Sequence, residues 1–122
     1  MESTESKKPV YDLEERTFQF AKAVRLMIKT LPKTIANIED IKQLVKSSGS
    51  AGANYIEANE SLSKKDFLVR VKISRKEIKE SSYWLRLIDE TNQLENDQEV
   101  KRLLREAVEL KKIFSAIIEK SK

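Results

Sequence analysis

The chain has 122 residues and a mass of 14.1 kDa, enough for one small hydrophobic core and too little for two. It contains no Cys and no His, which excludes disulfides, thiol nucleophiles, imidazole bases and the usual zinc sites. Only 2 Gly and 2 Pro are present, too few for the turns of a β-sandwich or barrel, so we expect an all-α protein. The formal net charge is +4 and 36% of the residues are charged, so each helix should keep a solvated face.

The N-terminal segment carries no targeting pattern. Lys7 and Lys8 are followed by Pro9 instead of an apolar stretch, which is unlike a secretory signal. We expect residues 1–10 to form a disordered tail. No run approaches the roughly 20 consecutive apolar residues of a membrane span. We therefore expect a cytoplasmic protein with no membrane partner.

The first predicted helix covers residues 12–30. Asp12 followed by Glu15 is typical of an N-cap and its return carboxylate, and Pro32 should end the helix. Steps of four and three predict one buried stripe, made of Leu13, Thr17, Phe20, Val24, Met27 and Leu31.

The second predicted helix covers residues 38–60, after a linker from Pro32 to Asn37. Residues 47–53 are small and could instead form a flexible linker, because each Gly inside a helix costs about 1 kcal/mol relative to Ala. The heptad keeps its phase through these residues, so we favour one continuous helix in which small side chains let a neighbouring helix approach closely. The expected inner positions are Ile38, Ile41, Val45, Ser48, Gly52, Tyr55 and Asn59.

The third predicted helix covers residues 63–90 and opens with Ser63 and Asp66 as a cap pair. Its core seam should be Phe67, Val71, Ser74, Ile78, Ser81, Leu85 and Ile88. Further apolar residues lie off this seam, which suggests a second buried face, because one stripe is enough for a helix in a single bundle. The residues predicted to form an oligomer interface are Val69, Ile73, Tyr83, Trp84 and Leu87. For Trp84, a place in the core is the simpler alternative.

The fourth predicted helix covers residues 97–120, with Asn96 and Glu99 as its cap. Its stripe should be Val100, Leu103, Ala107, Leu110, Phe114 and Ile117. Because the connections are short, consecutive helices should run antiparallel, which predicts a single up-down-up-down four-helix bundle over residues 11–122.

Several stretches resemble one protein family. Residues 50–58, Ser-Ala-Gly-Ala-Asn-Tyr-Ile-Glu-Ala, are similar to its serine, spacer and Asn-Ile-Ala-Glu-Gly box. Residues 63–68 resemble its Ser-x-x-Asp/Glu-Phe opening, and Ile73-Ser74-Arg75 its Ile-Ala-Arg run, although Lys76-Glu77 stand where the family has Gly-Ser. From Tyr11 to about Glu119 the chain resembles the bacterial large-subunit ribosomal RNA intervening-sequence proteins.

The resemblance implies a left-handed four-helix bundle that assembles as a homo-pentamer around a central channel. A related group is the accessory protein of diversity-generating retroelements, which looks like the same barrel and binds nucleic acid and a reverse transcriptase. The family name of the intervening-sequence branch itself indicates no activity.

Positive charge concentrates in the third predicted helix. Residues 62–91 hold eight Lys and Arg against five Asp and Glu. Five of the basic residues share one helical stripe about 30 Å long, on the solvent side of the core seam. We expect this stripe to contact nucleic-acid phosphates, and the alternative is an ordinary solvated helix face. The stripe consists of Lys65, Lys72, Lys76, Lys79 and Arg86.

Four polar residues are expected to be structural. Asn54 and Glu57 stand one turn apart and can hydrogen-bond to each other or to a neighbouring helix. Glu80 has apolar neighbours and should pair with a basic residue, for which Arg75, Arg25 and Arg70 are candidates.

These patterns predict a non-enzymatic protein with no metal, no cofactor and no catalytic residue. The first hypothesis is a homo-oligomeric scaffold that binds RNA or DNA phosphates. The alternative is a protein-interaction adaptor, for example for a reverse transcriptase, with no direct nucleic-acid role. An enzyme is the third class, and it would need an unrecognised carboxylate site.

Overall fold

A computed structural model of the protein describes residues 12–94 and 97–122, which form helices and connecting segments and no strands. The N-terminal tail expected at residues 1–10 and the cap residue Asn96 lie outside these ranges. The helices are α2 (Leu13–Met27), a 3₁₀ turn η1 (Ile28–Thr30), α3 (Ile35–Asn59), α4 (Lys64–Thr91) and α5 (Gln98–Lys120).

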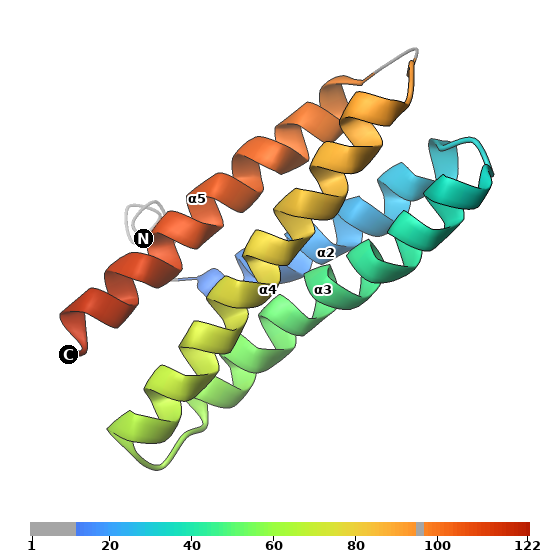
Figure 1. Ribbon diagram of the computed structural model, residues 1–122. Coiled ribbons are helices and arrows are strands. Elements are labelled where there is room, and N and C mark those ends of the chain that lie inside the picture. Colours follow the sequence, from blue (N-terminus) through green and yellow to red (C-terminus); the bar gives the residue numbers. More distant parts are fainter. Residues whose placement is uncertain (1–11, 95–96) are drawn as a thin grey trace, which may run out of the picture.

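The four α-helices form an antiparallel bundle, as expected (Figure 1). Each helix contacts the next along the chain, and α2 also contacts α5, which closes the bundle. The α3 and α4 helices are the two longest and form one hairpin along the molecule (Figure 1). None of the helices in the described ranges combines the length and the apolar character needed to cross a membrane.

Local signals set the helix starts. Asp12 accepts a hydrogen bond from the Glu15 backbone nitrogen at 3.2 Å, and Ser63 accepts one from that of Asp66 at 3.0 Å, as predicted. The expected start of the second helix at residue 38 is wrong, because the Thr34 hydroxyl caps a helix that already begins at Ile35.

For three of the four helices, the residues predicted to face the core are nearly the same as the residues that are buried in the structure. All six residues of the first predicted stripe are buried, five of them in α2 and Leu31 just after η1, and so is the α4 seam from Val71 onward. In α5 the stripe is right up to Phe114, after which Ile118 is buried in place of Ile117.

The predicted α3 stripe is displaced by one position along most of the helix. Ile38 is 42% exposed, whereas the neighbouring Asn37 is only 1% exposed. Asn37 tolerates burial because its amide donates to the Pro32 carbonyl at 2.8 Å and to the Asn92 side chain at 2.9 Å. The buried residues of α3 are Asn37, Leu44, Ser47, Ser48, Ala51 and Ala58.

The small residues at 47–53 lie inside a continuous helix, as predicted. A Cβ added at Gly52 would lie 3.0 Å from the Thr17 hydroxyl oxygen, so the missing side chain lets α2 approach α3 closely. A Cβ at Gly49 would meet only the tip of the Arg25 guanidinium, at 3.1 Å.

Candidate nucleic-acid interface

The five residues of the predicted basic stripe are all exposed on α4. They lie on the side of α4 away from its buried seam, which follows from their spacing of seven, four, three and seven residues. From Lys65 to Arg86 the stripe extends about 30 Å at 1.5 Å per residue.

The centre of the stripe forms a shallow hollow between α4 and α5. The hollow has a volume of about 290 Å³ and is lined by basic residues alone, namely Lys72, Arg75, Lys76, Lys79 and Lys111. We call it the basic hollow. Like charges brought this close repel one another unless a counter-ion or an anionic ligand lies between them.

Lys111, the α5 member of the basic hollow, is not among the predicted binding residues. It lies one turn before Ser115, whose hydroxyl accepts a hydrogen bond from Arg75 of α4 at 3.2 Å. The sequence could have indicated Lys111, because it directly follows the seam residue Leu110 and because consecutive antiparallel helices pack side by side, which places α5 next to α4.

Arg75 lies within the basic hollow, although it was predicted as a structural partner of Glu80. Its guanidinium donates a hydrogen bond to Ser115, while Glu80 accepts a hydrogen bond from the Trp84 indole nitrogen at 3.1 Å. The expected ion pair of Glu80 with an arginine is therefore wrong. Arg25 instead donates to backbone carbonyls of α2 and α3, and Arg70 contacts Asn54.

Two cations of the stripe lie close to carboxylates. Arg86 donates to Glu90 at 2.9 Å, and this hydrogen bond raises the pKa of its guanidinium, so the side chain stays charged. The Lys76 ammonium lies 3.9 Å from Glu77. The Arg86–Glu90 pair is exposed on both sides, and exposed ion pairs of this kind contribute little to stability. At the other end, Lys65 and Lys72 share a second hollow with Lys64.

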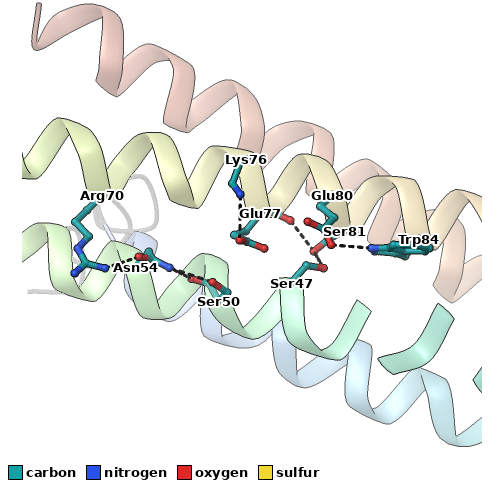
Figure 2. Close-up of polar contacts among 9 residues, drawn as sticks. All are labelled: Ser47, Ser50, Asn54, Arg70, Lys76, Glu77, Glu80, Ser81 and Trp84. Carbon is teal, nitrogen blue, oxygen red and sulfur yellow. Dashed lines mark hydrogen bonds and ion pairs between the residues drawn. The ribbon is translucent and has the colours of Figure 1, made fainter. Parts of the chain in front are cut away.

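Polar contacts fix α3 against α4 (Figure 2). The Asn54 amide donates to Ser50 on its own helix and accepts a hydrogen bond from Arg70 of α4 at 2.8 Å. Ser47 and Ser81 hydroxyls lie 2.8 Å apart, both buried. Glu57 is exposed one turn from Asn54 and does not bond to it. The hairpin thus holds the basic stripe on a rigid helix pair.

The predicted interface residues of α4 differ in burial. Val69 and Tyr83 are 50% and 57% exposed, and Ile73 and Leu87 are half-buried. Trp84 packs against the core and lies edge-on to Tyr83, with ring centroids 5.0 Å apart. We call the face formed by Val69, Ile73, Tyr83 and Leu87 the outer apolar face of α4.

Comparison with known proteins places the chain in a family. The family model of the 23S rRNA-intervening sequence protein matches residues 11–116. The chain belongs to this family. It also matches a crystal structure from Bacteroides thetaiotaomicron, described as a protein of unknown function from the S23 ribosomal protein family. The two are 27% identical with a TM-score of 0.74, over 86% of this chain and 96% of the other. No curated protein matches.

Proposed function

We propose that this intervening-sequence family protein is a non-enzymatic, cytoplasmic, homo-oligomeric scaffold that binds RNA or DNA phosphates through α4. The observation that carries the proposal is the basic hollow, where five cations from two helices gather with no acid in the lining. The oligomer is a pentamer if it follows the assembly that the family resemblance implies.

Phosphate is the ligand that best fits this surface. Lysine ammonium groups are flexible point charges, which suit contacts to the nucleic-acid backbone rather than reading of base edges. Tyr83 is the only aromatic residue predicted near the stripe, so stacking on unpaired bases is poorly supported. An oligomer would carry one basic hollow per subunit. The repeated hollows would increase the positive electrostatic potential and strengthen the binding of nucleic acid.

Assembly is supported by the outer apolar face of α4. Val69 and Tyr83 keep about half of their surface in water, whereas the apolar seam residues of the same helix, Val71, Ile78, Leu85 and Ile88, are fully buried. Large exposed apolar side chains on one face of a helix are typical of an interaction surface, although Lys76 and Glu80 lie between the Val69/Ile73 and Tyr83/Leu87 pairs along this face.

The decisive experiment measures binding to a structured RNA across a salt series. We expect affinity to fall steeply between about 50 and 200 mM salt, because binding releases counterions. The variant Lys72→Glu/Lys76→Glu/Lys79→Glu should lose at least about tenfold in affinity at the lower salt. The control Lys33→Glu/Lys46→Glu/Lys120→Glu makes the same charge change at exposed sites outside the basic hollow. Equal losses in both variants would contradict a specific site.

A second candidate function is a protein-interaction adaptor, favoured by the exposure of Val69 and Tyr83. An apolar protein interface should bind with little dependence on salt, in contrast to phosphate binding. Salt-independent capture of a protein partner, with no RNA binding, would favour the adaptor.

A further inference from the structure

A second apolar surface lies between α2 and α3, on a side of the bundle for which the sequence patterns predicted no partner. It is a groove of about 510 Å³ whose floor includes Gly49, Gly52 and Ala53. Two of its large apolar side chains, Phe18 and Leu26, are 59% and 53% exposed. Across the groove, Ile56 of α3 is 47% exposed. Exposed apolar side chains gathered along one groove are typical of a docking site.

The rim of this groove is positive. Lys22 and Arg25 of α2 and Lys29 of η1 follow one another at one-turn spacing, against a single acid, Glu14. Arg25 is held in place, since its guanidinium donates to the Ala21 carbonyl at 3.0 Å and to the Val45 carbonyl of α3 at 3.2 Å.

A surface of opposite charge lies on the neighbouring side of the bundle, between α3 and α4. This hollow of about 590 Å³ carries Glu57, Glu60 and Asp66 against a single cation, Arg70. Arg70 is already hydrogen-bonded to Asn54. Apolar side chains line it too, among them Leu62, which is 99% exposed, and Val69 of the outer apolar face of α4.

The two surfaces are complementary in charge, and each includes exposed apolar side chains. The groove carries three cations and one acid, and the hollow carries three acids and one cation. Both include α3, yet they lie on different sides of the same bundle, so they cannot meet within one chain. Surfaces on two different sides pair head to tail, and head-to-tail pairing closes into a ring when the rotation between copies allows it.

We propose that the positive groove between α2 and α3 receives the acidic surface between α3 and α4 of a second copy of this chain. This inference rests on the homo-oligomer of the proposed function. It names the two surfaces of the chain that meet between neighbouring copies. The side chains of Leu62 and Val69 enter the groove beside Phe18 and Ile56, and Glu57 and Glu60 lie against Lys22 and Lys29. Each copy contributes its groove to one neighbour and its acidic surface to the other.

Charge exchange tests the pairing. Lys22→Glu/Lys29→Glu makes the groove acidic, and Glu57→Lys/Glu60→Lys makes the partner surface basic. All four residues are exposed, so the variants should fold. We expect each pair to reduce the mass in light scattering from that of the oligomer to that of a single 14.1 kDa chain. The quadruple variant restores opposite charges across the interface and should recover the mass of the unmodified protein.

Controls separate this inference from the proposed function. Lys42→Glu/Lys46→Glu changes the charge equally at exposed sites outside both surfaces and should leave the mass unchanged. If the unmodified protein assembles and the charge-reversed pairs assemble equally well, the inference is overturned and the scaffold stands. If the quadruple variant stays monomeric while the unmodified protein and the Lys42→Glu/Lys46→Glu control assemble, the inference is also overturned. A monomeric unmodified protein overturns both the scaffold and this interface, and RNA binding is then tested independently by the salt series.

Discussion

The side chains of Asn37 and Asn92 hydrogen-bond to each other reciprocally, joining the start of α3 to the end of α4. The Asn37 amide nitrogen lies 2.9 Å from the Asn92 side-chain oxygen, and the Asn92 amide nitrogen lies 3.0 Å from that of Asn37. Each amide also reaches a backbone carbonyl, at Pro32 and Ile88 respectively. The pair thus satisfies polar groups at one end of the bundle where Asn37 is buried.

Removing one member of this pair should destabilise the fold. Asn37→Ala leaves the Pro32 carbonyl and the Asn92 amide without their partner, which we expect to cost about 1–3 kcal/mol in the free energy of unfolding. Urea denaturation measures the change. The double variant Asn37→Ala/Asn92→Ala should lose less than the sum of the two single losses, because both remove the same interaction. Additive losses would show that the two amides act independently.

Gly52 is expected to be irreplaceable, while Gly49 is not. An added Cβ at position 52 meets the Thr17 hydroxyl at 3.0 Å and the Thr17 Cβ at 3.3 Å, so Gly52→Ala should destabilise the protein by about 1–3 kcal/mol. Gly49→Ala meets only a flexible guanidinium and should gain stability through higher helix propensity, by up to about 1 kcal/mol. Thermal unfolding of the two variants makes the comparison.

A smaller residue opposite Gly52 provides the check on this explanation. Thr17→Ala removes the atom that the new methyl group meets, so Thr17→Ala/Gly52→Ala should be more stable than the sum of the single changes predicts. If Ala at position 49 and Ala at position 52 change the stability equally, the close approach of α2 does not determine the effect at either position.

Periodicity predicted most of this fold, because burial in a bundle follows side-chain spacing. The stripes of α2 and α4 were predicted correctly apart from Phe67, since their heptad spacing stays in phase even where Thr17, Ser74 and Ser81 replace apolar residues at buried positions. The stripe of α3 was misplaced because Ile38 is apolar yet exposed, and Asn37 is polar yet buried. The burial of Asn37 depends on the Pro32 carbonyl and on Asn92, 55 residues away, and no local pattern encodes the contact with Asn92.

The candidate site was predictable only in part for a similar reason. The stripe of α4 follows from spacing within one helix, but Lys111 joins it from α5. The groove between α2 and α3 was not predicted either, because Phe18, Leu26 and Ile56 fall outside the apolar stripes of their helices. Which off-stripe residues gather at one surface depends on how the helices are rotated against one another.

Acid should weaken the first turn of α5. The hydrogen bonds from Arg102, at 2.7 and 2.8 Å, hold the pKa of Glu99 below its usual range. A carboxylate with a lowered folded-state pKa stabilises the protein above its unfolded pKa, and the contribution is lost as the pH falls through the folded pKa. Because the Glu99 side chain is 41% exposed, solvent screening limits the effect to less than about 0.5 kcal/mol.

The glutamine variant isolates this contribution. Glu99→Gln should lower the melting temperature slightly at about pH 6, and the difference should disappear as the pH falls through the folded-state pKa of Glu99, because the wild-type carboxylate is then protonated as well. Thermal unfolding followed by circular dichroism across this range measures the difference. A gap between the two proteins that stays constant with pH would show that the Glu99 charge is not its source.

Substitutions of Trp84 and of its neighbour Tyr83 test which of the two side chains belongs to the core of the subunit and which belongs to the interface between subunits. The side chain is half-buried, packs against the core and donates to Glu80 through its indole nitrogen. We therefore expect Trp84→Ala to lower the free energy of unfolding by about 3 kcal/mol while leaving the mass of the assembly unchanged at low temperature. Tyr83 is 57% exposed, so Tyr83→Ala should reduce the mass of the assembly and change the free energy of unfolding little. Light scattering and urea denaturation of both variants give the answer, and loss of assembly in Trp84→Ala alone would place that residue in the interface.

Lys111 and Lys112 provide the sharpest test of the basic hollow, because they are adjacent, identical in charge and both exposed. Lys111 lines the basic hollow with the cations of α4, whereas Lys112 does not. Lys111→Glu should weaken binding to a structured RNA by about tenfold at 50 mM salt. It should also reduce the slope of log affinity against log salt concentration by about the amount expected for the loss of one phosphate contact. Lys112→Glu has the same effect on net charge and should change affinity much less. Equal losses would mean that RNA responds to the overall charge of the protein, and the hollow between α4 and α5 would then have no special role.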